Sequence, residues 1–467
     1  MKNIRIKIGI IGLIVMAAIS TLSAQEGTTL QFMKGMPQSD LQNPALHNDS
    51  SRIVIGLPAL SGMYFDYNNG FALNDLMHKG TGTLADSLVL DVDGFYNSLS
   101  TTNTVQMNFS APLFYLGIRS KKSFYSLGIS EKGVTRFSFD KAFVAFVKDG
   151  NGAYMGQNYD LGNLDMNAFH YREYALGYSN EVLKNKLTIG LKAKILFGKS
   201  AIQTERLNMM VETAADGSSV NLKSDMKVNV SAPVTVEYDS DGYFSGINGD
   251  NFEAGNYVLQ KGNMGMAFDL GAVYKLNSKI TLSGSIVDIG KISFKNDLIT
   301  LNHVSTYKWE GIDFSKSVDD SKADYVDPAD LVDDELEKMG NSFKPKKSEI
   351  GTDAFDMSLP TKIYLGGTYD LNSKVSFGLL DCLYKNGDIS RNTLTLSANA
   401  LLGNVFSVSG SYSLIGDSYS NVGLGTALRL GFLQLFFVSD NLLALTDPAK
   451  AKYVNARFGM NLLFGRK

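Results

Sequence analysis

The stretch YVNARFGMNLLF, residues 453–464, alternates apolar and polar or small side chains up to Leu462. In an extended chain successive side chains point to opposite sides, so residues of one parity share a face. One face would carry Val454, Ala456, Phe458, Met460, Leu462 and Phe464. The other would carry Tyr453, Asn455, Arg457, Gly459 and Asn461. The stretch therefore predicts a long strand between an apolar and a polar environment.

The same period of two recurs upstream. Leu394, Leu396, Ala398 and Ala400 alternate with Thr393, Thr395, Ser397 and Asn399. The string Tyr-x-Leu-Asn-Ser-Lys occurs at 274–279 and again at 369–374, each time followed by another alternating segment. Such a string predicts a hairpin with a tight Asn-Ser turn. Two similar hairpins indicate a sheet that is built from repeated hairpins.

Composition restricts the class of protein. Hydrophobic residues make up 44% of the 467 residues and charged residues 19%, while 45 Gly, 22 Tyr and 27 Phe against 9 Pro favour strands and turns. The single cysteine, Cys382, cannot form an internal disulfide. A net charge of −3 argues against a nucleic-acid partner, which would require a concentrated basic surface.

The N-terminus has the pattern of an export signal. Lys2, Arg5 and Lys7 precede an apolar run from Ile8 to Ile19, and small residues follow up to Ala24. This order predicts a cleaved signal peptide over residues 1–24, since the run is shorter than the roughly 20 residues of a membrane-spanning helix. Later in the chain no apolar run reaches that length. We therefore expect an exported protein located in the outer membrane.

A soluble sandwich also alternates, so other features must choose between it and a membrane barrel. The predicted strands are long, at 103–118, 421–430 and 452–464, and aromatic residues cluster near strand ends. Tight turns alternate with long polar connections, the longest at 68–102, 149–166, 238–256 and 312–356. These features favour an all-β fold, a transmembrane antiparallel barrel of about 14 strands (about 12–16) over residues 52–467.

Two segments do not read as barrel strands. In residues 25–51, Met36-Pro37 and Asn43-Pro44 interrupt any strand, so the segment is either a periplasmic extension or a plug in the lumen, with Asn43, Pro44 and Ala45 as candidate plug residues. The connection 312–356 is acidic and then basic. It is interpreted as a solvated outer loop with a short helix after Asp327-Pro328.

Alternation also assigns two arginines to the lumen. Arg457 and Arg429 are candidate lumen charges, because an arginine on the lipid face near mid-membrane would cost about 2–4 kcal/mol. We expect these arginines to pair with lumenal carboxylates, with contact to a substrate as the weaker alternative. On the apolar face of the last strand, Met460, Leu462 and Phe464 form a candidate signal for the barrel assembly machinery.

Signals for chemistry are weak. His47, His78, His170 and His303 are scattered without metal-ligand spacing, and no nucleophile elbow or phosphate-binding loop is present. We therefore expect no catalytic residues, no metal, no cofactor and no enzymatic activity. An alternative in which His170 or His303 works with a nearby acid is weaker than an ordinary place for each in a wall or loop.

Four stretches resemble an uncharacterised family of outer-membrane barrels from Bacteroidetes-type bacteria. They are LQFMKGMPQSDLQNPAL (30–46), GLPALSGMYFDYNNGFALNDL (56–76), SIVDIGKISF (285–294) and the C-terminal segment 431–465. That family is in turn similar to the barrels of long-chain fatty-acid transporters and of the type IX secretion shuttle. The resemblance implies a barrel with its N-terminal segment in or near the lumen, and it transfers no substrate. Its most recognisable pieces are Asn43–Ala45 and Asp440-Asn441.

Three functions fit such a barrel. The first is a plugged barrel that transports or holds a hydrophobic small molecule. The second is a structural protein that docks a partner through its loops or its periplasmic segment. The third, an open pore, requires a lumen ringed with charge, whereas the predicted lumen faces carry mainly Ser, Thr, Asn and Gly. The expected partners are outer-membrane lipid, the barrel assembly machinery and a hydrophobic small-molecule ligand, with no nucleic acid.

Overall fold

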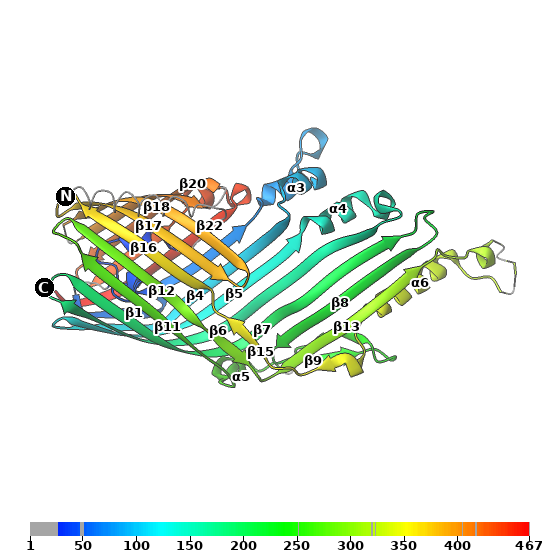
Figure 1. Ribbon diagram of the computed structural model, residues 1–467, viewed down its shortest axis with the longest axis horizontal. Coiled ribbons are helices and arrows are strands. Elements are labelled where there is room, and N and C mark those ends of the chain that lie inside the picture. Colours follow the sequence, from blue (N-terminus) through cyan, green and yellow to red (C-terminus); the bar gives the residue numbers. More distant parts are fainter. Residues whose placement is uncertain are drawn as a thin grey trace, which may run out of the picture.

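The alternating segments form one antiparallel sheet of 14 strands that closes on itself (Figure 1). The computed structural model describes residues 27–46, 51–250, 252–318, 321–322, 324–403, 405–415 and 418–466, so the predicted signal peptide lies outside the described residues. In ring order the strands are β1 (Ser51–Asn69), β4 (Thr102–Ser120), β5 (Ser123–Asp140), β6 (Asn158–Leu183), β7 (Leu187–Thr213), β11 (Asn263–Lys275), β12 (Ile280–Phe294), β16 (Thr361–Asp370), β17 (Val375–Asn386), β18 (Ile389–Leu402), β19 (Phe406–Ile415), β20 (Ser418–Leu430), β21 (Leu433–Ser439) and β22 (Tyr453–Arg466). Pairing of β1 with both β4 and β22 closes the ring. The predicted all-β transmembrane barrel of about 14 strands is confirmed.

The two Asn-Ser turns have the same geometry. The side-chain Oδ1 of Asn277 accepts hydrogen bonds from the backbone N–H groups two and three residues later, at 2.8 and 2.9 Å. Asn372 accepts the same pair at 2.8 and 2.9 Å. An asparagine that bonds the backbone ahead of it stabilises a tight turn, which explains why the string occurs twice.

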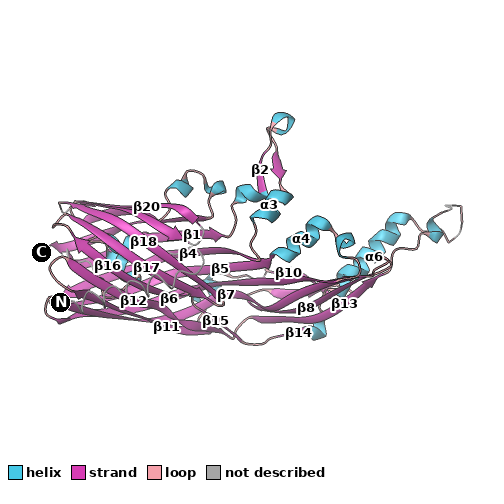
Figure 2. Ribbon diagram, turned by 45° about the horizontal axis from the view of Figure 1, so that its top comes forward, coloured by secondary structure: helices cyan, strands magenta, loops and turns pink. Residues whose placement is uncertain are grey.

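The two ends of the barrel differ. Short turns, including those at Asn277 and Asn372, gather at the end where β1 begins and β22 ends, since Ser51 pairs with Arg466. We call it the turn end. The opposite loop end carries the long connections and the helices (Figure 2). Its helices are α2 (Leu73–Leu76), α3 (Val92–Ser98), α4 (Lys141–Asp149), α5 (Ala254–Leu259) and α6 (Pro328–Ser342).

A flat sheet extends beyond the ring at the loop end (Figure 1). The first part of β7 pairs with β11 inside the ring, and its second part pairs with β8 (Val220–Ser231). β8 pairs in turn with β13 (Leu298–Trp309), which contacts β14 (Ile350–Gly351). β15 (Phe355–Ser358) pairs with the upper part of β12. Two small hairpins complete the loop end, β2 (Met77–Lys79) with β3 (Leu88–Leu90) and β9 (Thr235–Tyr238) with β10 (Phe244–Asn248).

This extension corrects two predicted loops. β6 begins at Asn158, inside the predicted polar connection 149–166, and 312–356 contributes β14 and the first half of β15. The predicted helix after Asp327 is present as α6, and Oδ1 of Asp327 caps it by accepting from the N–H of Ala329 at 2.8 Å. Burial and a hydrogen bond to Glu335 of α6 raise the pKa of Tyr307 to about 12.

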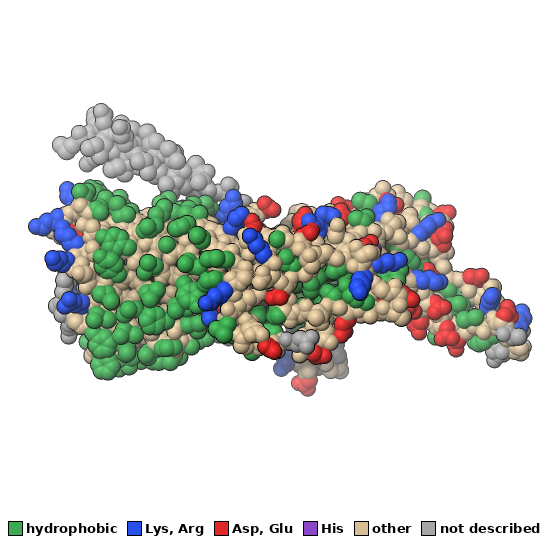
Figure 3. Space-filling model, turned by 90° about the horizontal axis from the view of Figure 1, so that it is seen from below, with side chains coloured by type: hydrophobic (Ala, Val, Ile, Leu, Met, Phe, Trp, Pro, Cys, Tyr) green, Lys and Arg blue, Asp and Glu red, His purple; other side chains and the backbone are tan. Residues whose placement is uncertain are grey.

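The outer face of the ring is apolar. Figure 3 shows hydrophobic side chains in a broad band over the ring and charged side chains over the extension and the turn-end rim. Exposed members of this band include Phe65, Phe109, Leu176, Leu191, Ile195, Met266, Phe268, Leu365, Leu379, Leu396 and Phe458. So much contiguous apolar surface is stable only against lipid or another protein. No helix among the described residues is both long and apolar enough to cross a membrane.

The predicted parity of β22 is correct. Phe458 and Phe464 are 48% and 40% exposed, whereas Asn455 and Asn461 are 2% and 0% exposed. Because side chains alternate along each strand and the outer face is apolar, the polar side chains of the ring point into the lumen. The interior therefore has to bury many hydrogen-bonding groups, and the way it does so defines the candidate site.

Candidate functional site: the filled lumen

The lumen is occupied by the N-terminal segment of residues 27–46, which we call the 27–46 segment. It contains two short 3-10 helices, η1 (Leu30–Phe32) and η2 (Pro37–Leu41), because Pro37 lacks the N–H that a strand would need and suits a helix start instead. Leu30 and Met36 are each 1% exposed, because they pack with Met33 against the buried wall residues Ala427, Phe436 and Val438.

Asn43, Pro44 and Ala45 form a turn against β11 and β12. The Asn43 Nδ2 donates to the carbonyls of Ala272 and Gly284 at 3.3 and 3.2 Å, and its Oδ1 accepts from the N–H of Ala45 at 2.9 Å. The amide side chain thus fixes its own turn and attaches it to the wall.

A glycine of the wall makes room for this turn. A Cβ on Gly190 of β7 would lie 2.3 Å from the carbonyl carbon of Pro44. Further around the ring, a Cβ on Gly378 of β17 would lie 2.2 Å from the Phe32 ring. The 27–46 segment therefore fits against the bare backbone of the wall at both positions.

The second recognisable sequence piece, Asp440-Asn441, holds the start of the segment. Oδ1 of Asp440 accepts from the N–H and the hydroxyl of Thr29 at 2.8 and 2.6 Å, and from the hydroxyl of Thr28 at 3.3 Å. Asn455 of β22 donates to the other carboxylate oxygen at 2.6 Å. Both of the most recognisable pieces of the resemblance thus lie where the segment contacts the wall. Asn43–Ala45 contacts β11 and β12, and Asp440 contacts Thr29.

One side of the lumen carries a cluster of buried charges. We call it the charged wall: Lys132, Glu173, Lys192, Lys194, Asp269, Asp288 and Lys362, from β5, β6, β7, β11, β12 and β16. Nζ of Lys194 lies 2.6 Å from carboxylate oxygens of both Asp269 and Asp288. Lys132 pairs with Glu173 at 2.8 Å. The prediction that lumen faces carry mainly Ser, Thr, Asn and Gly is wrong for this side.

Asp288 is held in an unusual backbone conformation. Its φ is +62°, in the left-handed region that non-glycine residues seldom occupy, and its N–H donates to Asp269 Oδ1 at 2.8 Å. The strand β12 changes partner here, from β16 below to β15 above. Because Asp288 interrupts the apolar run of SIVDIGKISF, an acid inside a predicted strand was the sequence signal that could have located the cluster.

The other side of the lumen is lined by small polar side chains. We call it the hydroxyl wall: Ser376, Thr393, Thr395, Ser397, Asn399, Ser407, Ser409, Ser411, Ser413 and Asn421, all buried, from β17 to β20. Ser411 Oγ lies 2.6 Å from Thr29 Oγ1, and Thr395 Oγ1 lies 2.8 Å from Ser413 Oγ. Here the predicted composition of the lumen face is correct.

Asp40 joins the 27–46 segment to the charged wall. Its Oδ2 accepts from the Tyr115 hydroxyl at 2.9 Å and lies 3.4 Å from Nζ of Lys192. Lys192 also donates to the backbone carbonyl of Asp40 at 3.0 Å. Nearby, Gln38 donates to Asn461 at 2.8 Å and to the Ser61 carbonyl at 2.9 Å. The segment is therefore held to the charged wall by Asp40 and to β22 and β1 by Gln38.

Two spaces remain above the segment. An inner cavity of about 100 Å³ has Gln38, Asp40 and Leu41 of the segment on its surface and the charged wall around it. A wider mouth of about 900 Å³ lies between strand segments nearer the loop end and is lined by polar groups such as Arg136 and Asp165. Val134 lines both spaces, so the two are neighbours.

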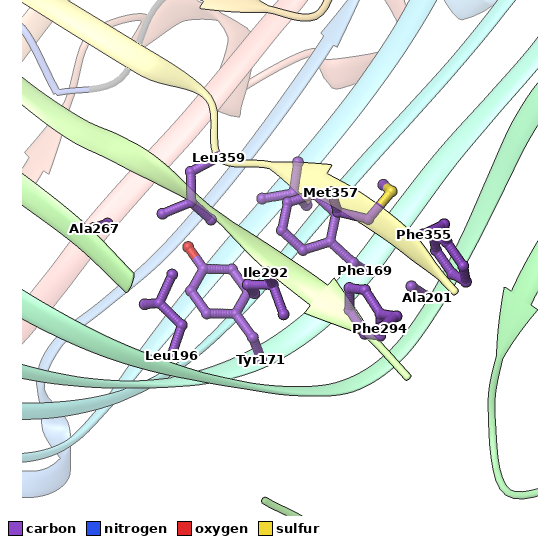
Figure 4. Packing of buried hydrophobic residues seen from close by; sticks show 11 residues of the cluster. Phe169, Tyr171, Leu196, Ala201, Ala267, Ile292, Phe294, Phe355, Met357 and Leu359 are labelled. Carbon is purple, nitrogen blue, oxygen red and sulfur yellow. The ribbon is translucent and has the colours of Figure 1, made fainter. Parts of the chain in front are cut away.

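Figure 4 shows a cluster of apolar side chains, and its members line both of these spaces. Its buried members are Val134, Phe169, Tyr171, Leu196, Ala201, Ala267, Ile292, Phe294, Phe355, Met357 and Leu359. Phe169 and Met357 line the mouth, while Tyr171 lines the inner cavity. An apolar patch between two polar spaces is not needed to satisfy the wall, and it offers a surface for an apolar molecule.

The two predicted lumen arginines have different surroundings. Arg457 is 8% exposed, stacks on the Tyr64 ring at 4.3 Å and donates to the Gly62 carbonyl at 3.3 Å. Among the described residues it forms no ion pair with a carboxylate, so the expected lumenal carboxylate partner is wrong for Arg457. Arg429 lies near the turn end, where its Nε donates to the Gly431 carbonyl at 3.2 Å beside Lys34 of the segment.

The remaining predicted residues lie away from the lumen. Met460 and Leu462 are half-buried on the outer side of β22, and Phe464 stacks on Phe432 with ring centroids 5.9 Å apart. His170 contacts Glu131 at 3.1 Å on the outside of the ring, and His303 contacts Glu349 at 3.1 Å in the extension. His78 lies in the β2 hairpin, and His47 lies outside the described residues. No group of three His, Cys, Asp or Glu residues able to hold a metal occurs in the described part of the chain.

The sequence match to a protein family extends over most of the ring. A family model covers residues 44–440, from the Asn43–Ala45 turn to Asp440. The chain belongs to a family of unknown function, DUF5723. The predicted membership in an uncharacterised barrel family is confirmed. The sequence matches none of the curated proteins.

Solved barrels are similar in overall form only. A FadL homologue of Pseudomonas aeruginosa is 11% identical, with a TM-score of 0.41 over 95% of this chain and 99% of that chain. The toluene transporter TbuX of Ralstonia pickettii is 8% identical, with a TM-score of 0.41 over 92% and 94%. The toluene transporter TodX of Pseudomonas putida is 8% identical, with a TM-score of 0.36 over 95% and 98%. At these scores the likeness carries no argument about the ligand of this DUF5723 member.

Proposed function

We propose that this chain is an outer-membrane barrel that transports or holds a hydrophobic small molecule, with the 27–46 segment as its plug. The outer apolar band would lie in the membrane, the turn end would face the periplasm and the loop end the exterior, as short turns and long loops are arranged in such barrels. A signal peptide over residues 1–24 would deliver the chain there.

The observation that carries the proposal is the apolar cluster inside the polar lumen. Phe169 and Met357 reach the mouth, and Tyr171 reaches the inner cavity above the 27–46 segment. A molecule that enters from the mouth would meet this cluster before it meets the segment. Burial of apolar surface supplies the affinity, at roughly 25 cal/mol per Å².

A crystal soaked with bromooctane tests this proposal, because the bromine can be located by anomalous scattering. The expected position is between Phe169 and Met357. A Phe169→Asp variant should lose the lumenal bromine, whereas Phe377→Asp, on the outer face, should keep it. Bromine that is found only on the outer apolar band would overturn the proposal.

A docking function is the second candidate, and the sheet extension favours it. Strands β6, β7, β8 and β13 continue past the ring, and α6 lies against β13 with exposed Leu336 and several acidic residues (Figure 2). A partner would recognise this projecting surface. Removal of residues 315–345 should then abolish a complex that survives detergent in the wild type, while apolar binding in the lumen persists.

A further inference from the structure

Lysines recur at a fixed position along the turn end. The pairs β4 and β5, β6 and β7, β11 and β12, and β16 and β17 are four successive hairpins of the ring. In each hairpin the residue directly before the second strand is a lysine: Lys122, Lys186, Lys279 and Lys374. Its backbone carbonyl accepts a hydrogen bond from the first strand of the next hairpin, at 2.7 to 3.1 Å. Because neighbouring strands lie about 4.8 Å apart, these lysines follow one another at roughly 10 Å along the rim.

The charge of this part of the rim is mainly positive. We call six exposed lysines the basic arc: Lys122, Lys184, Lys186, Lys275, Lys279 and Lys374. The two acids beside them are already paired, Glu181 with Lys122 at 3.5 Å and Asp370 with Lys34 of the 27–46 segment at 2.5 Å. The other five lysines of the arc form no ion pair within the described part of the chain. Figure 3 shows Lys and Arg side chains gathered at this end of the molecule.

Apolar side chains beside the basic arc place it at the surface of a membrane. Three of the turns carry a leucine that is at least 50% exposed: Leu183, Leu276 and Leu371. An exposed tyrosine precedes each of these turns: Tyr178, Tyr274 and Tyr369. Tyrosine is enriched where hydrocarbon meets the polar head groups, and Nζ of Lys279 lies 5.9 Å from the ring centre of Tyr369. A lysine there lays its stem on apolar surface and extends its ammonium group to the level of the head groups.

The other limit of the apolar band is different. Where the ring meets the extension, Nε of Arg172 in β6 donates to Glu131 of β5 at 2.6 Å. Lys291 of β12 pairs with Asp356 of β15 at 2.5 Å. Cations at this limit are thus neutralised by carboxylates of the neighbouring strand. The lysines of the basic arc lack such partners, so an anion that neutralises them has to come from outside the chain.

We infer that the basic arc binds the phosphate groups of anionic phospholipids in the leaflet at the turn end. Phosphates are the anions present at head-group depth, and a lysine near an anionic leaflet is attracted to it. The inference goes beyond the proposed transport function, because it requires only that the apolar band lies in a membrane. It assigns to the turn end a lipid partner that the loop end, with its paired charges, does not need.

Competition between two phospholipids tests the inference. Phosphatidylglycerol is anionic, whereas phosphatidylcholine has no net charge. The full-length protein in a neutral detergent is mixed with equal amounts of both lipids, and native mass spectrometry counts the molecules of each that stay bound. The wild type is expected to retain at least about tenfold more phosphatidylglycerol, because one lysine near an anionic surface changes binding by roughly fivefold.

Matched variants locate the effect. Replacement of four lysines by glutamine should make the two lipids bind equally: Lys184→Gln, Lys186→Gln, Lys279→Gln and Lys374→Gln. Arginine at the same four positions keeps the charge and should keep the preference. A control variant removes the same charge from exposed positions at the loop end and should also keep it: Lys308→Gln, Lys316→Gln, Lys322→Gln and Lys338→Gln. Heat-dependent gel mobility verifies that each variant is folded.

Three results would overturn the inference. The first is equal retention of the two lipids by the wild type, and the second is a preference that survives in the glutamine variant of the basic arc. The third is tighter binding of polyglutamate than of phosphatidylglycerol, which would assign the arc to a soluble acidic partner. None of these results involves the lumen, so the proposed hydrophobic ligand is tested separately by the bromooctane soak.

Discussion

The charged wall and the hydroxyl wall face each other across one lumen and fill it in different ways. On the charged wall, long side chains such as Lys194 occupy the space themselves and leave only the small inner cavity. On the hydroxyl wall, serines and threonines are too short to do so, and the 27–46 segment fills the space with residues such as Phe32 and Met33. Where wall side chains are long they fill the lumen themselves, and where they are serines, threonines or glycines, such as Gly378 of β17 and Gly190 of β7, the 27–46 segment fills it.

The largest effect is expected from Lys194→Met. The substitution leaves Asp269 and Asp288 buried beside each other without their shared cation, and breaking a buried charge cluster costs about 3–5 kcal/mol. Urea unfolding in lipid vesicles measures the free energy of unfolding. The double variant Lys194→Met, Asp269→Leu should recover part of the loss. A loss below about 1 kcal/mol for the single variant would mean that the ion pairs of Lys194 contribute no more to stability than a pair at the surface.

The next effect concerns the contact between segment and wall. Gly378→Ala places a methyl group 2.2 Å from the Phe32 ring and should displace the 27–46 segment, with a cost of about 1–3 kcal/mol. Limited proteolysis of the N-terminus measures the displacement. Gly410→Ala is the control, because a Cβ at Gly410 meets nothing within 4 Å. Equal cleavage of the two variants would contradict the proposed fit.

A smaller effect is expected at Asp440. Thr29→Val removes a hydroxyl that donates to the carboxylate at 2.6 Å and leaves the N–H bond from the same residue. A hydrogen bond to a charged group contributes about 1.5–3 kcal/mol, and the remaining donors to Asp440 should keep the loss near the lower limit. Chemical denaturation gives the value. No change in the free energy of unfolding would show that Asp440 stabilises the fold through its bond from Asn455 of β22 and not through Thr29.

The smallest effect is expected within the hydroxyl wall. Thr395→Val keeps the shape of the side chain and removes one hydrogen bond to Ser413, so the free energy of unfolding should fall by about 1 kcal/mol. The midpoint of heat-dependent gel mobility compares this variant with Lys194→Met. If both variants unfold at the same temperature, the distinction between the two walls is wrong.

Much of the ring could be predicted because a strand with lipid on one side must alternate. The parity of Phe458 and Asn455, the Asn277 and Asn372 turns and the number of strands all follow from that constraint. The hydroxyl wall was predicted for the same reason, since its small residues stand out at every second position.

The charged wall could not be predicted in the same way. Lys194 and Glu173 have the parity of lumen residues and are neighbours in the hairpin of β6 and β7, but only the long-range pairing of β7 with β11 brings them beside Asp288 of β12. The sheet extension was missed because the paired residues of β8 and β13 are 67 to 89 positions apart in sequence, from Leu298↔Ser231 to Trp309↔Val220, and no local pattern records such a pairing. The place of residues 27–46 was left open between two alternatives, because a segment without a strand pattern carries no periodic signal.

Planar-bilayer conductance tests the central claim, that the 27–46 segment closes the lumen. The intact protein is compared with a variant that lacks residues 28–46. The proposed plug predicts a closed intact barrel and a conducting deletion variant. The side chains of the hydroxyl wall are too short to fill the space that the segment leaves. Equal conductance of the two proteins would contradict the claim.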